Sequence, residues 1–458
     1  MAENSVSRRS FLSASSIAAP AAFSIVKPSQ VRGAGKEKLR AGLVGCGGRG
    51  TQAVSDLLAG TENVELVAMA DVFEDRLERS LRGLREGDVR YERYVGGEVI
   101  RDGKPHRLTE QEVRANIVNN IKVDPEHRFI GQDAYRKLVA SDLDIVMLAT
   151  PPAYRPLHFE AAIEANKHVF CEKPFGTDPV HVRRFMAAAR KSEEKRLTVV
   201  TGAQRRFQKP YVETVEKIHS GAIGDVVACY AYWVGTPVLQ QQARDPKWSD
   251  VEFQHRNWYS FVWICGDQIV EQHLHNIDVC NWVMGMHPER VRASGGAAWR
   301  PREEIYGNIY DHIVAEYIYP NGVIMHSHCR QYPTATRPGT AGFDYTQGIH
   351  TNISELVVGT KGRSNCRDMG RGGNDPYMQE HIAMIDSIRG DGPYINHGIR
   401  VAESTMTCIM GREAAYSGKE ITWNDIMMSR QDLMPKDLSP NAKIPVPPLP
   451  VPGKYQFV

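Results

Sequence analysis

The chain has 458 residues, of which 42% are hydrophobic, 24% charged and 8% aromatic. This composition is typical of a globular protein and excludes a disordered or fibrous chain. The formal net charge is +2, and the first 34 residues alone carry +3, so the remainder is close to neutral. A near-neutral body lacks the basic surface that nucleic acid requires, so we predict no nucleic-acid partner.

Residues 1–37 are predicted to be an export signal and linker. The stretch Ser7-Arg8-Arg9-Ser10-Phe11-Leu12 resembles the core of a twin-arginine signal, and a short run of small residues follows it. That run is too short to span a membrane, so we expect an exported, periplasmic protein without a membrane span in the mature chain. The alternative is a disordered basic tail.

The eight cysteines are scattered and contain no C-x-x-C pair. Their spacing indicates neither a disulfide framework nor a metal site. Cys46 and Cys171 are interpreted as small buried hydrophobic residues.

A glycine-rich turn follows the first predicted strand, which begins at Lys38. In GCGGRG, residues Gly45, Gly47 and Gly50 have the G-x-G-x-x-G spacing, and a helical segment, TQAVSDLLAG, follows. A strand, this turn and a helix together are typical of a dinucleotide-binding unit, with pyrophosphate at the helix N-terminus. Gly48 and Arg49 of the same turn are predicted to contact the cofactor as well.

Asp71 ends the next predicted strand, VELVAMAD, 21 residues after Gly50. A carboxylate there accepts hydrogen bonds from the ribose hydroxyls and repels a 2′-phosphate, which favours NAD over NADP.

Residues 80–130 are predicted to form an insertion with a hairpin near Gly96, Gly97 and Gly103. The fold then resumes with a helix in GQDAYRKLVAS and a buried parallel strand over 143–150, which Pro151 and Pro152 end. A helix, PLHFEAAIEAN, and the strand KHVFCEKP follow.

A dinucleotide unit with ATPP after one strand and CEKP after the next resembles the Gfo/Idh/MocA family of oxidoreductases. The resemblance covers almost the whole chain after residue 38, including GAQRRFQKPY at the start of a second domain and IDSIRGDGPYINHGIRVAESTMTCIMGREAAYSGKEITW, where a helix docks back. It implies that Lys173 lies beside the nicotinamide and the substrate hydroxyl. We assign further cofactor contacts to Thr150, Pro151, Pro152, His158 and Glu172.

The segment GDQIVEQHLHNIDVCNWVMG resembles the active-site helix of that family. His275 aligns with the family histidine and Asp278 follows it, whereas Glu271 replaces an aspartate and His273 a glycine. Glu271, His275 and Asp278 are spaced i, i+4 and i+7, which predicts one shared helical face. A core histidine at 275 and a structural role for Glu271 remain alternatives.

The resemblance implies a division of chemical roles. Lys173 acts as the base, His275 is its partner as proton acceptor or orienting group, and Glu271 holds or polarises the pair. Arg206, Tyr211 and Asp278 are predicted substrate contacts. His326 and His328 would share a face of a strand, but we predict no metal site.

The fold class predicted is α/β, with a Rossmann domain over 38–175 and an α+β domain over 176–440. Five β-type runs, DVVACYAYWV, RVRASGGAAW, DHIVAEYIY, GVIMHSHCR and SELVVGT, predict a mostly antiparallel open sheet. Its uncovered face implies a homo-oligomer, a dimer or tetramer. The stretch from Trp248 to Trp263 is predicted to cover the active site or to pack in the core, and 441–458 to form a Pro-rich extended arm.

The function predicted is that of an exported NAD-dependent oxidoreductase acting on a sugar or polyol-like substrate. Because twin-arginine export carries folded proteins and free NAD is scarce outside the cytoplasm, we expect the cofactor to be tightly held. One alternative is a glycoside hydrolase that works by oxidation, elimination and re-reduction on bound NAD. Another is a non-catalytic NAD-binding protein.

Overall fold

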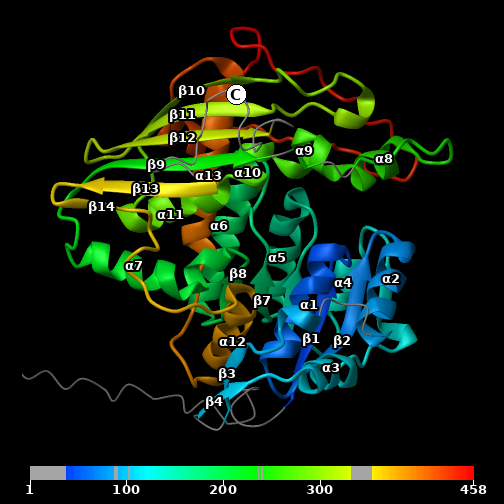
Figure 1. Cartoon of the computed structure of the whole chain (residues 1–458). Coiled ribbons are helices and arrows are strands. Elements are labelled where there is room, and N and C mark those ends of the chain that lie inside the picture. Colours follow the sequence, from blue (N-terminus) through cyan, green and yellow to red (C-terminus); the bar gives the residue numbers. More distant parts are fainter. Residues whose placement is uncertain (1–37, 87–90, 102–103, 236, 239–240, 332–352) are drawn as a thin grey trace, which may run out of the picture.

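The computed structural model describes residues 38–86, 91–101, 104–235, 237–238, 241–331 and 353–458. The predicted export signal lies outside these ranges, as does Gly103 of the predicted hairpin. The described chain folds into an N-terminal domain around a parallel sheet and a second domain around a mostly antiparallel sheet (Figure 1).

The N-terminal sheet has the strand order β5-β2-β1-β6-β7-β8, and every neighbouring pair is parallel. Its strands are β1 (Leu39–Val44), β2 (Val64–Asp71), β5 (Arg128–Ile130), β6 (Ile145–Leu148), β7 (His168–Cys171) and β8 (Val199–Thr201). The helices associated with it are α1 (Gly48–Gly60), α2 (Glu74–Glu86), α3 (Glu110–Asn119), α4 (Ala134–Val139), α5 (Arg155–Glu164) and α6 (Pro179–Glu194).

The continuous apolar run of β6 reflects a strand that is buried on both faces. Ile145 and Met147 pack into the core beside α1, whereas Val146 and Leu148 pack into the core beside α5 and α6, and none of the four is exposed to solvent. Side chains alternate between the faces of a strand, so a strand covered on both sides must be apolar throughout.

The parallel sheet continues past residue 175, where the sequence analysis ended the first domain. After β7 the chain forms α6 and returns as β8, which pairs in parallel with β7. Residue 175 therefore lies inside a β-α-β unit, and the sheet extends to Thr201. The predicted hairpin in the insertion is confirmed by the pair β3 (Glu98–Arg101) and β4 (Lys104–Arg107).

The second sheet has the strand order β14-β13-β9-β12-β11-β10-β15, and β9 with β12 is its parallel pair. Its strands are β9 (Val226–Gly235), β10 (Arg290–Gly296), β11 (His312–Ile318), β12 (Ile324–Gln331), β13 (Ile353–Gly359), β14 (Gly362–Ser364) and β15 (Ile421–Thr422). The five β-type runs of the sequence correspond to β9 to β13, which confirms the prediction.

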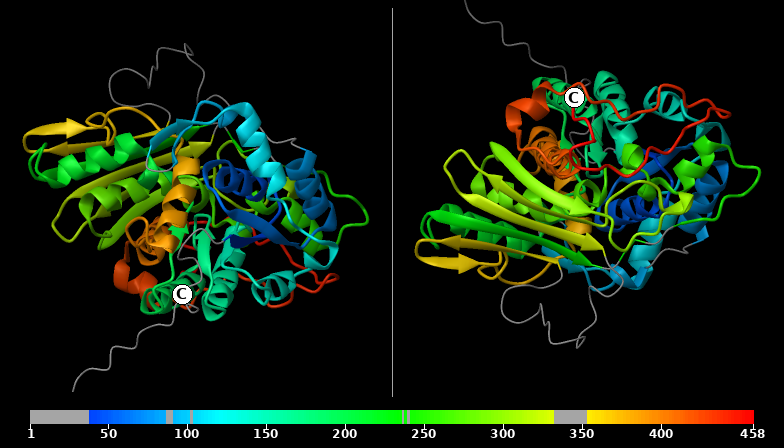
Figure 2. Two further views of the ribbon diagram at one scale, coloured as in Figure 1. Left: turned by 90° about the horizontal axis from the view of Figure 1, so that it is seen from below. Right: turned by 90° about the horizontal axis from the view of Figure 1, so that it is seen from above.

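Helices of the second domain gather on one face of this sheet, where α11 packs on β9 and β13 and α13 packs on β10 and β11 (Figure 2). On the other face, Val314 of β11 is 42% exposed. The helices after α6 are α7 (Lys209–His219), α8 (Asp250–Arg256), α9 (Val262–Cys265), α10 (Gln268–Glu271), α11 (Leu274–Met284), α12 (Pro376–Arg389), α13 (Gly398–Ser417) and α14 (Trp423–Met428).

Helix α12 returns from the second domain to the first, as the sequence analysis predicted. It packs against α1, and Met384, Ile385 and Ile388 join the core on that side of the parallel sheet. The C-terminal segment then runs extended over its own chain, where the carbonyls of Ile444 and Pro450 accept hydrogen bonds from Gln254 and Tyr310. None of the described helices is long and apolar enough to cross a membrane.

Candidate active site

The glycine turn is compact because two of its residues leave no room for a side chain. Gly45 has φ +95°, and a Cβ on it would lie 2.6 Å from the Thr150 nitrogen. A Cβ on Gly50 would lie 1.9 Å from the Gly45 carbonyl oxygen, so α1 can pack close to β1 only with glycine there. By contrast, Cβ atoms on Gly47 and Gly48 would meet nothing within 4 Å, so this backbone borders open space.

The open backbone coincides with the N-terminus of the 13-residue helix α1. Its N-cap Gly47 carries no side chain, so the first N–H groups of the helix are not capped. Free N–H groups and the helix dipole bind an anion such as pyrophosphate. The turn therefore fits the diphosphate of a dinucleotide.

Asp71 is held at the carboxyl end of β2 by backbone donors. The nitrogens of Cys46 and Phe73 donate to its two oxygens at 2.6 and 2.9 Å. Burial raises the pKa of this carboxyl, and the two backbone hydrogen bonds lower it. Each oxygen keeps a further lone pair, which is what binding two ribose hydroxyls requires.

A cavity of about 880 Å³ lies along the carboxyl ends of the parallel strands and extends to the second domain. Its lining includes twelve of the predicted site residues: Gly45, Gly47, Gly48, Arg49, Asp71, Thr150, Pro151, His158, Glu172, Lys173, Glu271 and His275. Gly50 and Pro152 are not among the lining residues. Open α/β sheets bind ligands at this edge, at the point where the strand order reverses.

Arg49 has its guanidinium turned to protein carboxylates. It donates to Glu172 at 2.5 Å, to Asp56 at 2.9 Å and to Glu380 of α12 at 3.1 Å. Each of the three nitrogens thereby donates to a carboxylate, and the side chain remains 29% exposed at the cavity. The side chain joins the glycine turn, the turn after β7 and α12.

Lys173 and Glu271 meet across the two domains. The Lys173 Nζ donates to the Glu271 main-chain carbonyl and, at 3.2 Å, to the Glu271 Oε1. Both side chains are about 9% exposed and both line the cavity. The peptide bond between Lys173 and Pro174 is cis.

His275 lies beside this pair at the start of α11. Its ring stacks on Trp233 with 5.9 Å between centroids, and its Nδ1 is buried without a partner. Burial, followed by the positive charge of Lys173, holds the pKa of His275 well below its usual range. The imidazole is therefore neutral at physiological pH and can accept or donate a hydrogen bond.

The prediction of one helical face for Glu271, His275 and Asp278 is wrong. Helix α10 ends at Glu271 and α11 begins at Leu274, with His273 buried at the junction, where it hydrogen-bonds Ser327. The break lets Glu271 and His275 face the cavity while Asp278 faces the protein interior. The spacing of these residues did not predict their orientation, because no single helix runs from Glu271 to Asp278.

The three predicted substrate contacts do not line the cavity. Arg206 donates two hydrogen bonds of 2.8 Å to Asp278, and the Tyr211 hydroxyl donates to Glu355. Ser404 also donates to Asp278. Buried polar groups need hydrogen-bond partners, and each of these three side chains has one inside the protein. The geometry therefore supports a structural role for Arg206, Tyr211 and Asp278.

Part of the stretch from Trp248 to Trp263, which the sequence analysis expected either over the active site or in the core, forms a roof over the nucleotide half of the cavity. From the second domain, Gln242, His255, Arg256 and Trp258 line the cavity, while Trp248 and Trp263 do not. Arg256 pairs with Asp75 at 3.1 Å and lies 4.1 Å over the Phe73 ring. The only signal in the sequence was the tryptophan-rich stretch itself, which could not distinguish roof from core.

The roof is fastened to the first domain at two further points. The Tyr154 hydroxyl and the His255 Nε2 are 2.5 Å apart, and Gln132 donates to the Leu438 carbonyl of the C-terminal segment. The hydrophobic cluster around Phe253, Phe261 and Trp263 includes Ala442 and Ile444 of that segment. The extended tail therefore supports the roof of its own chain.

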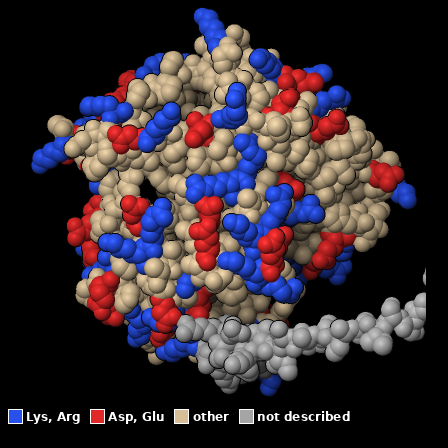
Figure 3. Space-filling view, turned by 180° about the vertical axis from the view of Figure 1, so that it is seen from behind, with Lys and Arg blue, Asp and Glu red and all other residues tan. Residues whose placement is uncertain are grey.

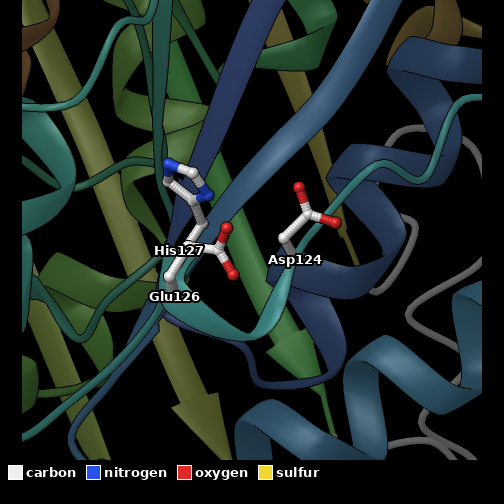
Figure 4. A group of neighbouring side chains, drawn as sticks. All are labelled: Asp124, Glu126 and His127. Atoms are coloured by element: carbon white, nitrogen blue, oxygen red, sulfur yellow. The ribbon is translucent and has the colours of Figure 1, made fainter.

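Two groups of potential metal-ligating side chains occur among the described residues. Asp124, Glu126 and His127 lie at the amino-end side of β5, away from the cavity edge (Figure 4). Asp178, His181 and Asp432 form the other, in which Asp178 caps α6 and accepts from Leu433. His326 and His328 share a face of β12, where His326 stacks on Tyr230 and His328 lies tilted beside Tyr232. We assign no ion to any of them.

The surface charge shows no single-sign field on the face opposite to that of Figure 1. Basic and acidic side chains are interspersed over it (Figure 3). This distribution agrees with the near-zero net charge.

The fold and this cavity together define an NAD-binding oxidoreductase domain. Residues 39–201 match the GFO_IDH_MocA model, described as the oxidoreductase family with an NAD-binding Rossmann fold. Residues 39–201 thus form a Gfo/Idh/MocA family domain, as the ATPP and CEKP motifs indicated.

Curated relatives match part of the chain. An uncharacterized oxidoreductase of Bacillus subtilis is 26% identical over 215 residues, 46% of this chain and 56% of the relative. The myo-inositol 2-dehydrogenase of Thermotoga maritima is 24% identical over 257 residues, 56% of this chain and 58% of the relative. The chain thus spans about half the length of these relatives.

Solved structures share the fold over most of the chain. The scyllo-inositol dehydrogenase of Lactobacillus casei, solved with NAD(H) and scyllo-inositol, has a TM-score of 0.57 at 16% identity and covers 84% of this chain and 99% of its own. The aldose-aldose oxidoreductase of Caulobacter crescentus has a TM-score of 0.55 at 17% identity and covers 84% of this chain and 100% of its own.

Proposed function

We propose that the protein oxidises a secondary alcohol of a sugar or cyclic polyol with NAD as the hydride acceptor. The observation that carries the proposal is the meeting of Lys173, Glu271 and His275 in the cavity that also contains the glycine turn and Asp71. Names of the relatives support the substrate class, since several are inositol dehydrogenases.

The hydrogen bonds of Lys173 suit it to act as the base. Glu271 accepts two hydrogen bonds from Nζ, which fixes the amine at the edge of the cavity and leaves its third position for a ligand there. A substrate hydroxyl at that position could pass its proton to Nζ. The neutral His275 can orient that hydroxyl by a hydrogen bond, and bound NAD supplies the hydride acceptor.

We further propose that the nucleotide stays bound between turnovers and that the protein is exported through the twin-arginine pathway. The roof over the nucleotide half supports retention. All eight cysteines are buried and unpaired, which suits a chain that folds in a reducing compartment before export. We expect periplasmic protein to carry bound nucleotide by mass spectrometry. Periplasmic protein without nucleotide would contradict retention, and absence of the protein from the periplasm would contradict export.

The open face of the second sheet supports a homo-oligomer. The exposed Val314 of β11 would be covered if two copies paired through this face. Light scattering should give the mass of a dimer or tetramer for the wild type. Val314→Lys should lower the mass of the assembly, because it puts a charge into the proposed interface. A monomeric wild-type protein would contradict this part of the proposal.

The test of the reaction is incubation of the protein with polyols, sugars and chromogenic glycosides. We expect reduced nicotinamide to accumulate with a polyol or sugar, without release of the chromogenic group. Release of that group with no net change of the cofactor would identify the hydrolytic alternative. Nucleotide binding without either reaction would indicate a non-catalytic protein.

A further inference from the structure

Arg155 is a buried cation at the reacting end of the cavity that motif comparison did not single out. It is the first residue of α5, directly after the Pro151-Pro152 turn, and it lines the cavity while only 5% exposed. Its Nη1 donates to the carbonyl of Pro174 at 3.0 Å. The side chain thus bridges the loops that follow β6 and β7.

The remaining donors of Arg155 lack protein acceptors. Its Nε is buried without a partner, and no described residue accepts from its Nη2. Burial lowers the pKa of the guanidinium, while Glu172 and Glu271 act on it only at longer range. Leaving a buried charged donor unsatisfied is costly, so a missing acceptor indicates a ligand.

The other buried arginines show what a satisfied guanidinium looks like in this protein. Three described arginines are less than a tenth exposed: Arg155, Arg300 and Arg412. Arg412 uses all three nitrogens, with Glu413 and two carbonyls. Arg300 uses two, donating to Tyr306 and Ser260. Arg155 uses one and is the member of the three that lines the cavity.

The position of Arg155 indicates which part of a dinucleotide it meets. Strand order reverses between β1 and β6, and a bound dinucleotide spans that point. Asp71, on the β2 side, takes the adenosine ribose, so the nicotinamide half lies over β6 and β7. Arg155 belongs to the first domain and lies in this floor, whereas Glu271 and His275 approach from the second domain, where the substrate must enter.

We propose that Arg155 donates to the carboxamide oxygen of the nicotinamide and thereby fixes the rotation of the ring. This inference rests on the proposed function, because it requires NAD in the cavity. A carboxamide oxygen is a strong acceptor, and a charged donor gives the more stable kind of hydrogen bond. With the ring fixed, the same face is presented to Lys173 at each turnover.

The test compares NAD with ADP-ribose, which lacks the nicotinamide, by calorimetric titration of nucleotide-free protein. In the wild type, NAD should bind more tightly than ADP-ribose. Arg155→Met should weaken NAD roughly tenfold or more while leaving ADP-ribose within about twofold, because one charge-assisted bond is lost. Arg155→Lys should recover part of the affinity for NAD that Arg155→Met loses.

Arg300→Met is the matched control, because it removes an equally buried guanidinium outside the cavity. It should lower the melting temperature and leave the NAD to ADP-ribose ratio unchanged. If Arg155→Met also left that ratio unchanged, the assignment would be overturned, and a fall in turnover alone would place the acceptor on the substrate. A wild-type protein that bound neither nucleotide would contradict the proposed function itself.

Discussion

Lys173 is the residue on which the proposed reaction depends. Lys173→Ala should leave NAD affinity within about twofold and lower turnover roughly 10²–10⁴-fold, the range for loss of a general base. Stopped-flow kinetics and titration with NAD measure the two quantities. Lys209→Ala changes an exposed lysine that pairs with Glu213, and it should alter neither. Near-normal turnover of Lys173→Ala would remove this residue from the mechanism.

Asp71 sets the preference between NAD and NADP. Asp71→Asn should weaken NAD binding roughly tenfold, because a charged acceptor of ribose hydroxyls becomes a neutral one. The same change should narrow the difference between NAD and NADP. Dissociation constants for both nucleotides check this, with Asp124→Asn, at the opposite edge of the sheet, as the control. An unchanged NAD affinity would show that the ribose lies elsewhere.

His255 couples the roof to pH. Burial lowers its pKa to about 4, against about 6.5 in an unfolded chain. The unfolded state therefore binds the extra proton first, so stability is full above about pH 6.5 and falls as the pH drops toward 4. The slope is about 1.4 kcal/mol of unfolding free energy per pH unit.

Urea unfolding of His255→Gln at several pH values checks this effect. Between pH 6 and pH 4.5, the unfolding free energy of the variant should change with pH by about 1.4 kcal/mol per unit less than that of the wild type. The contribution of the other buried histidines should be the same in both proteins. Equal slopes for the variant and the wild type would mean that His255 is protonated in the folded protein.

At the scale of elements, the roof formed by α8 and the following turn should control nucleotide release. Arg256→Ala removes both the pair with Asp75 and the contact with Phe73. Such interactions are each worth about 0.5–1 kcal/mol at a partly exposed site, so losing both should make release roughly 5–30-fold faster. Displacement of bound NADH, followed by its fluorescence, measures the rate.

The control for the roof is Arg184→Ala, which breaks an ion pair with Glu160 outside the cavity. It should leave release unchanged. If Arg256→Ala released the nucleotide no faster than this control, the roof would not retain the cofactor.

Regular elements were predictable wherever one simple pattern decided them. The run from Leu143 to Thr150 is apolar throughout because β6 is covered on both faces. The glycine turn was predictable because a tight turn and a close backbone approach both require glycine. Asp71 was predictable because the ribose hydroxyls require a hydrogen-bond acceptor at the end of that strand. Helix α12 returned to the first domain as the family resemblance implied.

Contacts between distant segments were not predictable from one sequence. The break between α10 and α11 places His273 against Ser327, more than fifty residues away, and no local pattern reports such a contact. For the same reason Arg206 and Asp278 were expected to meet a substrate, although they bind each other. Arg155 was missed because an arginine after a proline turn has no distinctive spacing.

At the scale of the whole molecule, the cavity is closed by both domains. The first domain supplies the glycine turn, Asp71 and Lys173, and the second supplies Glu271, His275 and the roof. The tail supports the roof through Gln132 and Gln254. Residues of both sheets share one hydrophobic cluster, which holds the two domains together around this cavity.

The most direct test of the central claim is to add a series of polyols and sugars to protein that carries its own NAD and to follow the absorbance of reduced nicotinamide in a single turnover. We predict that at least one cyclic polyol or sugar reduces one equivalent of bound nucleotide in the wild type and almost none in Lys173→Ala. Reduction at equal rates in both proteins, or in neither, would contradict the account.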